Sequence, residues 1–193
     1  MKTEFEARIL NISFDMVIAK LETVGAKRIG IFHQKRYTYD FVPRRKGNWV
    51  RLRSNGAIAT LAIKEIKPQE IKEKTLDGTN ELEVTVSDFE DTNLILEKLG
   101  YNAQSYQENF RMQYKLDNVE VDLEKWPMLP PFMEIEGISK EDILKTIKLL
   151  DINTDDITTI DIDTIYKENN IDLNAISSLK FSDEERLFID QFK

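Results

Sequence analysis

Acidic and basic residues alternate with apolar residues near the start of the chain. The segment TEFEARI carries Glu4, Glu6 and Arg8 at every second position. Clustered carboxylates offer the hard oxygen ligands that Mg²⁺ and Mn²⁺ prefer, and guanidinium or ammonium groups bind phosphate oxygens. A site that contains both sets would bind a polyphosphate bridged to a divalent cation.

The same alternation recurs in later segments. Successive side chains of a β-strand point to opposite faces, so residues two apart share a face. Each segment would therefore place its charged side chains on one face and its apolar side chains on the other. The later charged positions are Arg51, Arg53, Lys64, Glu81, Glu83, Arg111, Lys115, Glu120, Asp122, Glu124, Glu134 and Glu136.

A solvated sheet face is the commoner explanation of such alternation. These positions hold full charges, however, where a wet face would also accept Ser, Thr, Asn and Gln. Eight antiparallel strands close readily into a barrel, and amphipathic helices need an apolar surface to cover. We therefore predict an α+β fold in which an eight-stranded antiparallel β-barrel forms a tunnel with a charged interior, with helices packed outside.

The elements expected from the residue pattern are short strands and three main helices. Strands are predicted at 4–10, 35–42, 49–53, 59–65, 81–86, 108–116, 119–124 and 132–136. Helices are predicted at 13–26, 87–100 and 139–150, with Ser13 as the cap of the first and Gly25 and Gly100 ending the first two. A last short helix begins after Ser182.

Composition narrows the class of protein. The 193 residues and 22.6 kDa fit one main domain, predicted at 1–150, with a mainly helical C-terminal appendage at 151–193 packed on it. The net charge of −8 argues against nucleic-acid binding. The absence of Cys fits a reducing compartment, and the chain lacks a long apolar run, so we expect a cytoplasmic protein without a membrane partner.

The charged positions divide into two ligand sets. Metal ligands for Mg²⁺ or Mn²⁺ are expected from Glu4, Glu6, Asp122, Glu134 and Glu136. Phosphate ligands are expected from Arg8, Arg51, Arg53, Lys64 and Arg111. Burying either set alone would cost several kcal/mol per ion, so the two sets together favour a metal–polyphosphate ligand.

The ordered motifs TEFEARI, YTYDF, WVRLRS, LAIKE, ELEVTV, RMQY, VEVDLEKWP and FMEIEG resemble those of the CYTH family, the triphosphate tunnel metalloenzymes. The resemblance covers residues 2–137 and implies the tunnel fold and the two ligand sets above. It also implies that Lys64 and Tyr37 could assist the attack of water, as a Lys and Tyr pair is thought to do in some tripolyphosphatases. The chain departs from the pattern at Arg8 (usually Lys), Arg36 (often Asp) and Asn109 (often basic).

The leading hypothesis is divalent-metal-dependent hydrolysis of a triphosphate such as inorganic tripolyphosphate, thiamine triphosphate or a nucleoside triphosphate. One alternative is a class IV adenylate cyclase that converts ATP to cyclic AMP. Another is a non-catalytic module that binds polyphosphate or a nucleotide, and the blandest is a structural domain with a charged sheet. The sequence does not fix the oligomeric state, and a homodimer is one possibility.

Overall fold

The computed structural model describes residues 2–66 and 78–192, with the backbone alone described for residues 2–4, 66, 78 and 79. Within this part the strands are β1 Lys2–Ile9, β2 Lys27–Asp40, β3 Asn48–Ser54, β4 Ala59–Ile66, β5 Gly78–Val86, β6 Ser105–Leu116, β7 Val119–Lys125, β8 Phe132–Gly137, β9 Ile157–Thr158 and β10 Ser178–Leu179. The helices are α1 Phe14–Thr23, α2 Phe89–Lys98, α3 Lys140–Leu149, α4 Ile162–Glu168 and α5 Asp183–Asp190.

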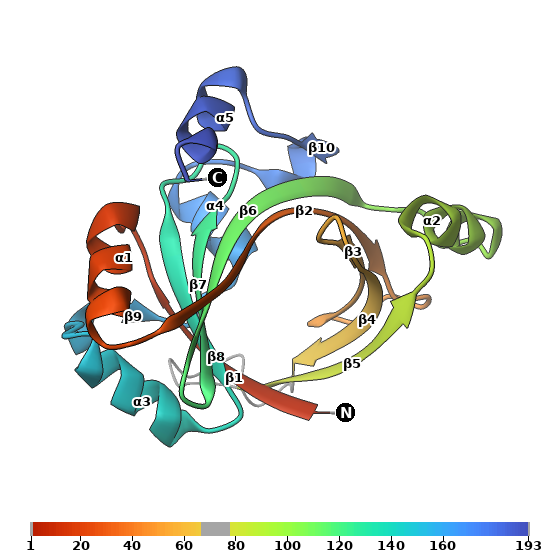
Figure 1. The fold of residues 1–193 in the computed structure, drawn as a ribbon. Helices are drawn as coiled ribbons and strands as arrows, with labels where there is room; N and C mark the ends of the chain where they lie inside the picture. The colour runs from red at the N-terminus through yellow and green to blue at the C-terminus, as the bar shows by residue number, and fades with distance from the viewer. Residues whose placement is uncertain (1, 67–77, 193) are drawn as a thin grey trace.

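Antiparallel pairing connects the long strands in the order β6-β2-β3-β4-β5-β1-β8-β7, and β7 also pairs with β6. Figure 1 shows these strands curving around a common centre, with α1 and α3 on one side and α2 on the opposite side. Two short strands extend the sheet, since β9 pairs with β1 and β10 lies parallel to β6. The predicted α+β fold with antiparallel strands is confirmed, but the described sheet has ten strands and not eight.

The apolar faces of the strands form the core beneath the helices. Under α1 and α3, the buried residues include Ala7 of β1, Leu21 of α1 and Ile143 of α3. A separate cluster under α2 contains Tyr39 and Phe89. The alternation seen in the sequence thus sends apolar side chains of β1, β2 and β3 towards the helices, as expected for amphipathic elements. In β5 the apolar side chains of Leu82 and Val84 remain about half exposed.

Helix caps follow the sequence in most places. Asp88 and Ser139 accept hydrogen bonds from main-chain N–H groups in the first turns of α2 and α3. Ser182 forms a capping box with Glu185 at α5, whereas Ser13 occupies the N-cap of α1 without a side-chain bond. Among the described residues, none of the helices has the length and apolar content needed to cross a membrane.

The C-terminal region packs against the segment between β7 and β8. Trp126 and Phe132 share a buried cluster with Ile165 and Tyr166 of α4. The Tyr166 hydroxyl donates a hydrogen bond of 2.7 Å to the carbonyl of Pro127. The chain after residue 156 therefore supports this connection of the sheet through buried apolar and polar contacts.

Candidate functional site

The charged side chains of the long strands gather on the sheet face opposite the helix-covered core, here called the charged face. On β1, Ala7 and Ile9 are buried in the core, whereas Glu6 and Arg8 form an ion pair with each other at 3.0 Å. The side chain of Glu4 lies outside the described part of the chain. Strand register places Glu6 beside Glu136, and Arg8 beside Glu134.

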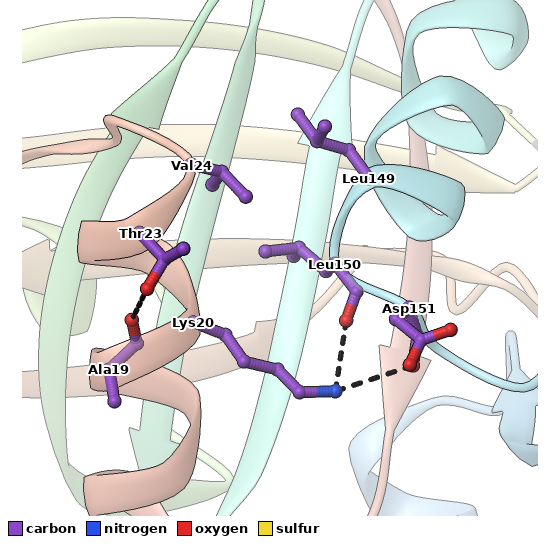
Figure 2. Close-up of a pocket in the computed structure, with 7 residues that line it drawn as sticks. All are labelled: Ala19, Lys20, Thr23, Val24, Leu149, Leu150 and Asp151. Carbon is purple, nitrogen blue, oxygen red and sulfur yellow. Dashed lines mark hydrogen bonds between the residues drawn. The ribbon is translucent and has the colours of Figure 1, made fainter.

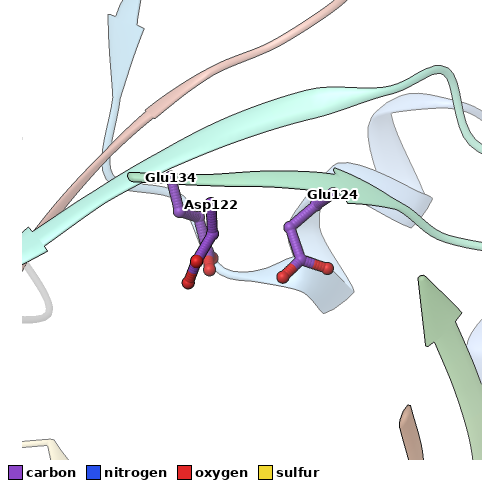
Figure 3. A group of neighbouring side chains, drawn as sticks. All are labelled: Asp122, Glu124 and Glu134. Carbon is purple, nitrogen blue, oxygen red and sulfur yellow. The ribbon is translucent and has the colours of Figure 1, made fainter. Parts of the chain in front are cut away.

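Arg111 of β6 holds together three carboxylates from β7 and β8. Its guanidinium pairs with Asp122 at 2.6 Å, with Glu134 at 3.2 Å and, more closely, with Glu124. Figure 3 shows these three carboxylates extending from the two strands into the same space. Arg8 adds a 2.6 Å bond to Glu134, so these residues and Glu6 form one group, the acidic network.

Burial and neighbouring charge act in opposite directions in the acidic network. Burial alone lowers the pKa of Arg8 and of Arg111, but the adjacent carboxylates outweigh it and raise the pKa of both. Burial likewise raises the pKa of Glu134, but the charges of Arg8 and Arg111 hold it well below its usual range. Asp122 differs, because burial raises its pKa to about 7 despite the pair with Arg111.

The acidic network has the chemistry of a hard-metal site. Ligand oxygens of Asp122, Glu124 and Glu134 all lie within 4.8 Å of one another. The Oδ1 atom of Asp122 is buried and has no hydrogen-bond partner, which is costly unless another group binds it. The donor set therefore fits a divalent cation that prefers oxygen ligands.

Glu124 was absent from the predicted metal ligands, although its alternation with Asp122 placed it on the charged face. Its Oε1 accepts from Arg111, while its Oε2 accepts from Asn109 at 2.8 Å and from the Trp126 indole at 3.0 Å. Both oxygens are thus occupied by protein donors. Glu124 thus positions Arg111, Asn109 and Trp126. Like Glu134, whose two oxygens accept from Arg8 and Arg111, it would bind a metal only after giving up one of these bonds.

A second group, the basic network, lies on β3, β4 and β5. Arg51 pairs with Glu81 at 2.8 Å and with Glu83 at 3.1 Å, Arg53 reaches Glu83 at 3.5 Å, and Lys64 pairs with Glu81 at 2.9 Å. Burial, followed by the repulsion of Arg51 and Arg111, lowers the pKa of Arg53 to about 10. Among the side chains that the structure describes on β3, β4 and β5, three cations thus share two carboxylates, which leaves positive charge for an anion.

The structure does not bring Tyr37 to Lys64. The Tyr37 ring stacks on Phe89 of α2 with centroids 5.2 Å apart and contacts Tyr106 at 5.4 Å. It belongs to the core under α2, whereas Lys64 pairs with Glu81 on the charged face. Since neighbouring residues of a strand point to opposite faces, Arg36 occupies the charged face in place of Tyr37.

A separate hollow lies between α1 and α3 (Figure 2). Aliphatic side chains such as Val24 and Leu149 contribute much of its lining. The Lys20 ammonium donates to the carbonyls of Leu150 and Asp151, at 3.0 and 3.3 Å, so its hydrogen bonds serve to join the two helices. The charged face, and not this hollow, is therefore the candidate functional site.

Comparison with known proteins identifies the fold. The family model described as the CYTH domain matches residues 2–155. A solved structure from Pyrococcus horikoshii OT3 is 24% identical and has a TM-score of 0.71, covering 84% of this chain and 98% of that one. A search of curated proteins finds no match.

Two other similar structures carry functional descriptions. A proposed adenylate cyclase from Vibrio parahaemolyticus is 14% identical with a TM-score of 0.71, covering 86% of this chain and 98% of that one. A proposed adenylyl cyclase from Hippeastrum, described as having a dominant triphosphatase activity, is 12% identical with a TM-score of 0.56, covering 88% and 96%. At these identities the likeness shows the fold.

Proposed function

Because the chain belongs to the CYTH family, we propose that it is a divalent-metal-dependent hydrolase of a triphosphate. The observation that carries the proposal is the presence, on one sheet face, of an acidic network suited to a metal and a basic network suited to phosphate. A triphosphate with its metal supplies both the negative and the positive charge that these networks require.

The binding site in this proposal is a tunnel formed by the eight long strands, with the charged face inside and the helices outside. Support comes from the strand pairings, in which β7 joins β8 on one side and β6 on the other. Support also comes from burial, since Arg8, Arg51 and Asp122 are each less than 9% exposed despite their charge. A strand curvature that surrounds the ligand would keep such charges away from bulk water.

The proposed phosphate ligands are Arg8, Arg51, Arg53, Lys64 and Arg111, and the proposed metal ligands are Glu4, Glu6, Asp122, Glu134 and Glu136. When bound, Mg²⁺ or Mn²⁺ would neutralise charge on the phosphate oxygens and polarise the phosphorus. The anion would compete with Glu134 for Arg8 and Arg111 and so release carboxylate oxygens. Lys64 remains in the proposed role of assisting water, whereas Tyr37 is left out because it faces α2.

A substrate panel tests hydrolysis. Purified protein with Mg²⁺ or Mn²⁺ is expected to release phosphate from tripolyphosphate, thiamine triphosphate or ATP. Arg53→Ala is expected to lower kcat by about 10²-fold or more, as for loss of a charge-stabilising donor. Arg186→Ala, which removes an exposed pair with Glu108, is the matched control. The absence of phosphate release from every substrate would refute hydrolysis.

Cyclisation of ATP is the second candidate, favoured by similar structures that are described as proposed adenylate cyclases. Cyclic AMP and pyrophosphate formed from ATP in the same panel would select it. The position of Tyr37 away from Lys64 favours a third candidate, a module that binds polyphosphate or a nucleotide without turnover. Tight binding of tripolyphosphate by calorimetry, without product, would select that candidate.

Further expectations from the sequence remain part of the proposal. Residues 1–150 are the tunnel domain and residues 151–193 an appendage that packs on it, supported by the pairing of β9 with β1. The proposed partner is a small molecule that contains a triphosphate, rather than a nucleic acid or a membrane. The proposed location is the cytoplasm, and the chain could act as a monomer or as a homodimer. The lack of Cys supports that location.

A further inference from the structure

Arg36 of β2 is a buried cation without a carboxylate partner among the described side chains. Its side chain lies on the charged face, and the residue is 9% exposed. Its described hydrogen bonds go to neutral oxygens: Nη2 donates to Gln34 Oε1 at 3.2 Å and, more closely, to Asn109 Oδ1. Its Nε is buried and has no partner.

The neighbours of Arg36 increase its positive potential. Strand register places Arg36 directly beside Arg53 of β3, and like charges in this relation destabilise a sheet. Burial first, and then the charges of Arg51 and Arg53, lower the pKa of Arg36 well below its usual range. The Nε of Arg51 is also buried without a partner. Three guanidiniums therefore converge, and two of them, those of Arg36 and Arg51, have a buried donor without a partner.

Neutral groups fix the position of the Arg36 guanidinium. It lies 4.4 Å from the ring centre of Trp126, a cation–π contact. Trp126 and Asn109 both donate to Glu124 Oε2. These groups hold the guanidinium in place, and the charge of Glu124, which raises the pKa of Arg36, offsets only part of the effect of burial and of Arg51 and Arg53. Such fixed and incompletely neutralised charge is how a preorganised anion site is built.

We propose that Arg36 is a further anion-binding residue of this site and that Arg36, Arg51 and Arg53 together bind one phosphoryl group of the substrate. This rests on the proposed function, because it takes the ligand to be a triphosphate. The donors left unsatisfied at Arg36 and Arg51 would then bond to phosphate oxygens. Asn109 and Trp126 act as positioning residues for Arg36.

Arg36→Gln tests the proposal, with Arg28→Gln as its matched control. Arg28 lies on the same strand and is exposed, so both variants change the net charge equally. Affinity for tripolyphosphate is measured by calorimetry in EDTA, and phosphate release by wild type is measured separately with metal. Arg36→Gln is expected to bind about 10- to 100-fold more weakly than wild type, as for the loss of a charged hydrogen bond, while Arg28→Gln binds as wild type does.

Thermal unfolding without ligand separates binding from a structural role. If Arg36 serves the anion, Arg36→Gln melts at the same temperature as wild type or higher, because a repelled buried charge is removed. A markedly lower melting temperature with unchanged affinity would show that Arg36 is structural and overturn the proposal. Arg36→Lys, which keeps the charge, is expected to recover part of the affinity.

The outcomes for Arg36 and for hydrolysis are distinguishable. If wild type releases phosphate but Arg36→Gln binds tripolyphosphate equally well, the Arg36 proposal alone is overturned. If wild type binds tripolyphosphate without releasing phosphate from any substrate, hydrolysis is refuted, and the affinity of Arg36→Gln still decides the role of Arg36. If wild type releases phosphate with metal but shows no binding in EDTA, the KM of Arg36→Gln for tripolyphosphate decides the role of Arg36. If wild type neither binds tripolyphosphate nor releases phosphate, both proposals are wrong.

Discussion

Replacing Asp122 with Asn is expected to stabilise the metal-free protein. Asp122 is 1% exposed, and its Oδ1 has no partner. Burial raises the pKa of Asp122 from 3.8 to about 7 even though Arg111 lies beside it. At pH 8 the carboxyl is ionised in both the folded and the unfolded state, and the difference between the two pKa values corresponds to about 4 kcal/mol of folding free energy lost.

An Asn side chain removes this cost but has a cost of its own. A buried amide with incomplete hydrogen bonding costs about 1–3 kcal/mol, so a net gain of about 2 kcal/mol in the free energy of unfolding is expected. For a chain of this length that gain raises the melting temperature by about 4–8 °C. Arg111 keeps its pairs with Glu124 and Glu134 in the variant.

Thermal and urea unfolding at pH 8 in EDTA would measure this gain. Asp117→Asn is the control, because Asp117 lies in the turn before β7 and forms an exposed pair with Lys145. That change should stay within about 0.5 kcal/mol of wild type. Under the proposed function, saturating Mn²⁺ should stabilise wild type and not Asp122→Asn. A metal-free Asp122→Asn less stable than wild type would refute the reasoning, since the pair with Arg111 would then outweigh burial.

Three further changes probe the contacts around the site. Arg111→Met leaves three buried carboxylates without their shared cation and should lower the free energy of unfolding in urea by about 3–5 kcal/mol; an unchanged midpoint would contradict this. Tyr166→Phe removes the donor to Pro127 and should cost about 1–3 kcal/mol in the same assay, whereas no loss would show that the bond is dispensable. Burial raises the pKa of Glu185, but hydrogen bonds from Lys125 and from main-chain N–H groups outweigh burial and lower the pKa below its usual value. Glu185→Gln should therefore melt below wild type at pH 7, and the difference should shrink as the pH falls below the ordinary pKa of Glu, about 4. A difference independent of pH would show that the charge of Glu185 does not stabilise the fold.

Alternation in the sequence predicted the faces of the strands correctly, because side-chain direction along a strand is a local property. It separated Glu6 and Arg8 from Ala7 and Ile9, and the apolar set packs under the helices as expected. The long β2 was predicted only from residue 35, whereas it begins at Lys27. The pairing of β2 with β6 shifts register between Arg28 and Gly30. Such an irregularity interrupts the alternation of polar and apolar residues by which a strand is recognised in the sequence.

Contacts between distant strands could not be predicted in the same way. That Arg111 contacts three carboxylates depends on the register of β6, β7 and β8, which a single strand does not encode. The strands β9 and β10 contain two residues each, too few to show any period. Tyr37 is a different case, because alternation along β2 predicts that Tyr37 and its charged neighbour Arg36 lie on opposite faces of the sheet. The sequence therefore contained the information that Tyr37 faces away from the charged face, but the role of Tyr37 was taken from the family resemblance.

The division of charge between the two networks explains why the site suits a metal–phosphate complex better than either component alone. On one side Arg8 and Arg111 face four carboxylates, those of Glu6, Asp122, Glu124 and Glu134. On the other side the cations of the basic network outnumber its carboxylates among the side chains placed by the structure. Arg36 adds a further cation that pairs with none of the described carboxylates.

A free anion would meet the basic network but leave the acidic one in excess, and a free cation would do the reverse. The cation relieves the repulsion among carboxylates that remains when the anion binds alone, and the anion relieves the repulsion among guanidinium and ammonium groups that remains when the cation binds alone. The two ligands should therefore strengthen each other's binding. The coupling is reciprocal because it arises from one shared set of charges. It follows that the affinity of the proposed site depends on Arg8 and Arg111 being able to exchange carboxylate partners for phosphate, since these two residues contact the carboxylates proposed to bind metal.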